Sequence, residues 1–168
     1  MKFPWWKLII GFLFYLFFHQ VHEIFPGSLP GVLLGEGIPA IYPHMKMLFY
    51  SYLTVSLIDY ALNRKRIKLE PFLYARMLIL SAVPWMMIAI YFSFEAVGIV
   101  LPFIAELAWG IFMTAVGVYL CILFEKPFEG MPLNAAARRV IVLVFAATLI
   151  TYVGFSFQVP DNFFQVLD

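Results

Sequence analysis

The sequence predicts an all-α integral membrane protein, a polytopic bundle of five transmembrane helices. Of its 168 residues, 64% are hydrophobic and only 12% are charged, which is about half the charged share of a soluble domain. The mean hydropathy of +0.92 indicates that most of the outer surface faces lipid rather than water. The apolar residues also gather in segments long enough to cross a bilayer.

These segments follow one another along one predicted domain, residues 1–168. The first begins with MKFPWWK, where Pro4 suits a first helical turn and the two tryptophans suit a membrane interface. No small-x-small cleavage site follows, so we expect a retained helix rather than a signal peptide. The expected helices cover about residues 5–25, 43–62, 71–93, 102–125 and 137–157.

Local signals characterise the later helices. The second ends at NRKRIK, the strongest basic cluster of the chain. The third contains Pro84, which should kink it. The fourth carries Gly110, Thr114 and Gly117, a small-residue stripe suited to close helix contact. FEKPFEGMPLNAAARR then connects it to the fifth.

Residues 26–43 interrupt the helical pattern with eight Gly and Pro residues. The stretch is nevertheless apolar, and irregular backbone at a membrane must be buried in protein or line a wet cavity. It therefore predicts an outer flap over the first, second and fourth helices. We expect Leu33 and Leu34 to face inward and Glu36 to lie near Lys46 or a histidine.

The distribution of charge predicts the orientation in the cell membrane, because lysine and arginine concentrate on the cytoplasmic side. In a five-helix arrangement one side carries Lys2, Lys7, Arg64, Lys65, Arg66, Lys68, Lys126, Arg138 and Arg139. The other carries Lys46 as its only basic residue, beside Glu23, Glu36, Glu95, Asp161 and Asp168. The N-terminus is thus expected in the cytoplasm and the C-terminus outside, in a multi-pass protein.

An unusual group of polar residues falls near the predicted outer side. His19, His22 and Glu23 lie on the first helix at spacings of three and four, so His19 shares a face with each of the others. His44 opens the second helix and Glu106 lies one turn inside the fourth. Charges within a membrane cost at least about 2.5–3.5 kcal/mol each, so such groups usually face inward and serve a function. Each could instead simply hydrogen-bond and tie helices together.

Three kinds of chemistry fit this group. His19, His22, Glu23 and His44 could bind zinc or iron, because two histidines, a carboxylate and a third histidine are a common ligand set. Haem fits less well, since His19 and His44 are expected at different depths. Metal-free acid–base catalysis on a lipid or isoprenoid would use His19, Glu23, His44 and Glu106. The pocket would then bind a hydrophobic small molecule.

Other features limit the alternatives. A net charge of +1 and the absence of a nucleic-acid motif argue against a nucleic-acid partner. The single cysteine, Cys121, excludes an internal disulfide. Asp59 and Arg76 flank the basic loop and are expected to form an interfacial ion pair. An accessory or structural subunit that docks onto a membrane-protein partner is the alternative to a binding protein or enzyme.

The segment PAIYPHMKMLFYSYL (39–53) resembles the signature of a prokaryotic family of small integral membrane proteins described as domain of unknown function sixty-five-twelve. His44, Lys46, Leu48 and Phe49 match its PVNESxWEHxKLLFFP segment. The closing FSFQVPDNFF (155–164) is similar to the family's FTxxPPxxxLF. The Asn-Glu-Ser of the signature is not retained. The resemblance implies a compact bundle of five or six helices and carries no assigned function.

Overall fold

The computed structural model describes residues 3–35, 41–93, 97–99 and 101–157, and all regular secondary structure in these ranges is helical. Within the described residues, one short helix and five long ones follow each other along the chain. They are α1 (Trp5–Ile24), α2 (Leu29–Leu34), α3 (Ile41–Asn63), α4 (Leu69–Tyr91), α6 (Phe103–Glu129) and α7 (Ala135–Phe157). The predicted all-α fold class is confirmed for this part of the chain.

The ends of the long helices agree with the prediction to within two residues except at one place. Helix α6 continues to Glu129, four residues beyond the predicted end, and runs through Pro127. A proline removes only one backbone hydrogen bond from a last turn. The Gly130 amide still donates to the Lys126 carbonyl at 3.1 Å, so the turn remains helical.

Three of the described helices, α4, α6 and α7, are long and apolar enough to cross a membrane. Helices α1 and α3 have 20 and 23 residues, or about 30 Å and more along their axes. Their sequences include charged and imidazole side chains such as Lys7, His19 and Asp59, which lower their average hydropathy. By length alone they match the other three.

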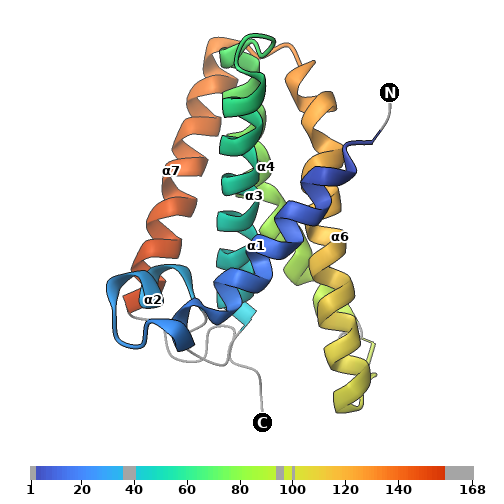
Figure 1. Cartoon of the computed structure of the whole chain (residues 1–168). Coiled ribbons are helices and arrows are strands. Elements are labelled where there is room, and N and C mark those ends of the chain that lie inside the picture. Colours follow the sequence, from blue (N-terminus) through green and yellow to red (C-terminus); the bar gives the residue numbers. More distant parts are fainter. Residues whose placement is uncertain (1–2, 36–40, 94–96, 100, 158–168) are drawn as a thin grey trace.

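Successive long helices run in opposite directions (Figure 1). The α3–α4 and α6–α7 connections therefore lie at one end of the bundle, at the top of Figure 1. We call this the basic end, because its connections carry Arg64, Lys65, Arg66 and Lys68. The opposite end, where α1 ends and α3 begins, is called the histidine end because it carries His19, His22 and His44.

Helix α1 crosses α6 obliquely, and Gly11 lies where the two helices approach closely, since a Cβ atom there would lie 2.7 Å from Val118 Cγ1. Gly117 of α6 lies in the same way against α3, where a Cβ atom would lie 2.8 Å from Leu48 Cδ2. A larger residue at either position would force its neighbour to move. Beyond the Gly11 crossing, α1 and α6 diverge toward the histidine end (Figure 1).

Helix α2 is the main described part of the predicted flap. It packs against α1 and α3, as expected, and also against α7. Lys46, on α3, explains this position, because its Nζ donates to the Val32 carbonyl at 2.9 Å and to Ser156 Oγ of α7 at 3.1 Å. Leu34 packs against the core as predicted. The predicted position of Glu36 lies outside the described residues.

Candidate functional site

A cavity of about 560 Å³ lies at the histidine end, between α1, α3, α4 and α6. Its volume falls within the range of about 300–1,000 Å³ that is usual for small-molecule sites. Leu16, Leu107 and Ile111 line it and are also exposed on the outer surface of the bundle. The cavity therefore opens sideways, between α1 and α6.

The cavity exists because small side chains of α6 face the space that α1 leaves open. Gly110 and Thr114 both line it, and a Cβ atom at Gly110 would have no atom within 4 Å. The Thr114 hydroxyl is satisfied by its own helix, donating to the Gly110 carbonyl at 2.9 Å. The predicted small-residue stripe thus has two functions: Gly117 permits close packing, whereas Gly110 and Thr114 leave a cavity.

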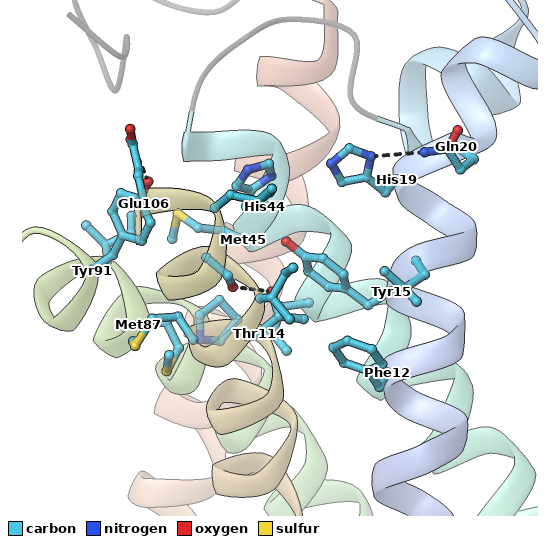
Figure 2. Close-up of a pocket in the computed structure, with 18 of the residues that line it drawn as sticks. Phe12, Tyr15, His19, Gln20, His44, Met45, Met87, Tyr91, Glu106 and Thr114 are labelled. Carbon is cyan, nitrogen blue, oxygen red and sulfur yellow. Dashed lines mark hydrogen bonds between the residues drawn. The ribbon is translucent and has the colours of Figure 1, made fainter. Parts of the chain in front are cut away.

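The lining is polar at one end and apolar at the other (Figure 2). Glu106, His44, His19 and Gln20 gather near the end of the bundle, in the upper part of Figure 2. Deeper in the bundle the walls are mainly apolar. They include Phe12, Leu16, Leu48, Met87, Ile111 and Met113. This polarity matches an amphipathic molecule with its head near the histidines.

Two predicted site residues from different helices meet in this cavity. The His19 and His44 ring centroids are 5.8 Å apart, with 29° between the ring planes. The His44 ring also lies 6.5 Å from that of Tyr15. Gln20 Nε2 is 3.5 Å from His19 Nδ1. Imidazoles can donate, accept or carry a proton near neutral pH, so this pair offers hydrogen bonds to a polar head group.

Glu106 lines the opposite wall of the cavity, as its position in the first turn of α6 suggests. Tyr91 OH donates to Glu106 Oε1 at 3.3 Å, and Trp109 Nε1 donates to the Tyr91 carbonyl at 3.4 Å. These contacts tie the start of α6 to the end of α4. The carboxylate is therefore held at the polar end of the cavity.

His22 and Glu23 do not line the cavity, contrary to the expectation that they join His19. Helix α2 turns back onto α1 beside His22, since a Cβ atom at Gly35 would lie 2.5 Å from the His22 amide nitrogen. His22 therefore faces the α1–α2 junction. Glu23 is exposed near the end of α1. A residue that shares a helix face with His19 can still lie beyond the cavity by one turn, about 5.4 Å.

The predicted metal set is consequently divided. His19 and His44 lie in the cavity, while His22 and Glu23 lie outside it. Among the described residues, no three His, Cys, Asp or Glu side chains are grouped so that they could hold a metal ion. The arrangement therefore suits hydrogen bonding to an organic ligand better than a three-ligand metal centre.

A second polar cluster lies at the basic end, and the sequence predicts only its Asp59–Arg76 pair. Lys7 Nζ lies 2.6 Å from Asp59 Oδ2 and 2.5 Å from Glu125 Oε2. Arg76 Nη2 lies 3.4 Å from Asp59 Oδ2, 3.2 Å from Glu125 Oε2 and 3.0 Å from Glu129 Oε1. We call these five residues the charge network.

The charge network is buried and involves four helices. Lys7, Asp59, Arg76 and Glu125 come from α1, α3, α4 and α6 and are all buried. Tyr52 OH donates to Glu125 Oε1 at 3.1 Å. The expected Asp59–Arg76 pair is therefore part of a larger structure. A sequence signal existed: Lys7 and Glu125 lie inside apolar helical segments at the same predicted end as that pair.

Comparisons with known proteins add no family or relative. No protein-family model, no curated protein and no solved structure matches this chain. The resemblance to the small membrane protein family remains a prediction.

Proposed function

We propose that this protein binds an amphipathic small molecule, drawn from the outer leaflet of the cell membrane, in the cavity between α1, α3, α4 and α6. One observation carries the proposal. A single cavity combines imidazole, amide and carboxylate groups at one end with aromatic, aliphatic and thioether groups at the other. Such a lining stabilises a ligand that has a polar head and an apolar body.

Five membrane-spanning helices are the arrangement that best supports this function. Three described helices meet the length and hydropathy needed to span. The charged side chains Lys7, Lys46 and Asp59 of these helices are all buried, and Glu23 is exposed only in the last turn of α1. Over residues 5–17 the exposed side chains of α1 are apolar or aromatic, including Leu13 and Phe17. The outward-facing surface of both helices is therefore more apolar than their average hydropathy indicates.

The basic end belongs in the cytoplasm by the positive-inside rule. Cysteine labelling tests this orientation in a Cys121→Ser background. A membrane-impermeant maleimide added to intact cells should modify Leu29→Cys, at the exposed start of α2, and should spare Lys65→Cys. Labelling of Lys65→Cys from outside would reverse the orientation and place the cavity in the inner leaflet.

The lateral opening indicates that the ligand is dissolved in the membrane. The exposed side chains at the rim, Leu16, Leu107 and Ile111, offer nothing that would attract a polar solute from water. An apolar body can instead slide between α1 and α6 from the surrounding lipid. Its head would then exchange hydrogen bonds with His19, His44 and Glu106. This placement also suits proton transfer to or from the head, should the bound molecule react.

Filling the cavity tests the proposed function. In Gly110→Leu the new side chain enters open space at the cavity wall, so the fold should remain intact while the ligand is excluded. Gly154→Leu is the matched control, because Gly154 also has open space around it but lies on exposed α7. Lipids extracted from purified protein should include a stoichiometric species in the wild type and in Gly154→Leu, reduced about tenfold or more in Gly110→Leu. Equal retention by all three proteins would contradict the proposal.

A further inference from the structure

The cavity and the charge network are built by the same four helices. Helices α1, α3, α4 and α6 line the cavity, and the same four supply the buried network. Helices α2 and α7 contribute to neither. The two polar regions therefore lie along one bundle of four helices, one toward each end.

Buried apolar side chains of α4 and α6 separate the two regions, which approach each other more closely on α1. On α1, Lys7 belongs to the network, Gly11 lies one turn further, and Phe12 lines the cavity. Gly11 is in close contact with the Val118 and Val55 side chains. Along α1 the network residue Lys7 and the cavity residue Phe12 are thus only five positions, about 7.5 Å, apart, with Val55 and Val118 packed beside Gly11 between them.

Stability alone does not explain the charge network. Replacing a buried ion-pair cluster with well-packed apolar residues is often neutral or stabilising, and buried charges are best attested where they select between arrangements. Ionisable groups within a membrane usually mark a path for a substrate or ion. Arg76 Nε and Nη1 are also buried without a hydrogen-bond partner among the described residues. These two nitrogens could therefore donate hydrogen bonds to a polar group of a ligand.

We propose that the protein carries its amphipathic ligand between the two sides of the membrane, with the charge network as a gate at the basic end. The described structure is the state in which the cavity is open at the histidine end as well as sideways, because Gln20 at its polar end is exposed. Movement of α1 about the Gly11 crossing would separate Lys7 from Asp59 and Glu125, open the basic end and narrow the cavity mouth. The ligand head could then pass to the unpartnered Arg76 donors. This inference rests on the proposed binding function.

Cysteine accessibility tests the gate without a known ligand. The reporter is Thr114→Cys in a Cys121→Ser background, because Thr114 lines the cavity and Cys121 is the only native cysteine. A charged, membrane-impermeant methanethiosulfonate is added to right-side-out or inside-out vesicles. With the network intact, labelling should come from the histidine end. With Lys7→Met and Glu125→Gln combined, labelling from the basic end should rise about tenfold and labelling from the histidine end should fall.

Controls separate a gate from a general loss of packing. Arg138→Gln removes a surface ion pair with Glu70. It should not change the rate at which Thr114→Cys is labelled from either end. A second reporter, Thr148→Cys on α7, is buried outside the cavity and should stay unlabelled. Labelling of Thr148→Cys in the double variant would show a general loss of packing. The gate is then tested with Tyr52→Phe in place of the double variant, because this change removes only one hydrogen bond to the network.

The outcomes distinguish the two proposals. If Thr114→Cys is still labelled only from the histidine end in the double variant, or in Tyr52→Phe where that variant replaces it, the gate is wrong and the binding function is unaffected. Absence of labelling of Thr114→Cys from either side, with the network intact, would overturn the open cavity itself. A shift of labelling from the histidine end to the basic end supports both.

Discussion

Replacing Lys7 with methionine tests the energetic importance of the charge network. The side chains have similar length, so packing is largely kept while the ammonium group is removed. Lys7 is 5% exposed, and its Nζ bridges Asp59 at 2.6 Å and Glu125 at 2.5 Å. The variant therefore leaves two buried carboxylates that have lost their nearest cation.

The expected loss follows from what remains around these carboxylates. Removing one partner of a buried ion pair costs about 3–5 kcal/mol. Arg76 still lies 3.4 Å from Asp59 and 3.2 Å from Glu125, so we expect the lower end, about 3 kcal/mol. For a domain of this size the melting temperature should then fall by about 6–12 °C.

Unfolding of the purified protein in detergent, followed by circular dichroism, measures this loss. Lys126→Gln is the matched control, because its side chain is 64% exposed although its Nζ lies 2.7 Å from Glu129. An exposed pair contributes less than about 1 kcal/mol. Adding Glu125→Gln to Lys7→Met should recover part of the loss, because it removes one of the three carboxylates that then share Arg76. A loss in Lys7→Met no greater than in Lys126→Gln would refute the reasoning.

Further predictions concern single contacts. Gly11→Ala should destabilise the protein, because its Cβ would lie 2.7 Å from Val118 Cγ1, whereas Gly110→Ala should stabilise it by up to about 0.5–1 kcal/mol, having open space and a better helix former. Thermal unfolding of both variants tests this, and equal shifts would contradict it. Lys46→Met should release α2 by removing the charged donor that bonds Val32 of α2 and Ser156 of α7. Hydrogen exchange over residues 29–34 should then accelerate about tenfold or more. Unchanged exchange would show that apolar packing alone holds α2.

The long helices are predictable because their signal is local. Apolar runs bounded by Gly, Pro and charged residues give the helix ends to within two residues at nearly every boundary. The exception, at Pro127, arises because a proline in a last turn costs only one hydrogen bond. Local rules of this kind are contained in the sequence itself.

The candidate site is only partly predictable, because contacts between distant segments decide it. His19 and His44 share a cavity, as their common end of the bundle suggests. His22 lies at the junction with α2 instead of in the cavity. The position of α2 depends on the contacts of Lys46 with Val32 and Ser156. No spacing rule in the sequence reveals those contacts.

The charge network shows the same limit. Lys7 and Glu125 are 118 positions apart, and their pairing follows from the crossing of α1 and α6. Each alone reads as an ordinary charged residue at a membrane interface. Their burial, and the Asp59 and Arg76 side chains that complete the network with them, become visible only when four helices are assembled.

Photo-cross-linking from inside the cavity tests the central claim most directly. Benzoylphenylalanine placed at Phe12, in the cavity wall, should capture in living cells one amphipathic species that mass spectrometry resolves as a discrete adduct. The same residue placed at Leu143, on the exposed face of α7, should capture the bulk membrane lipids. Adding Gly110→Leu should remove the discrete adduct at position 12. The same mixture of bulk lipids at both positions, or an adduct that persists with Gly110→Leu, would contradict a specific binding cavity.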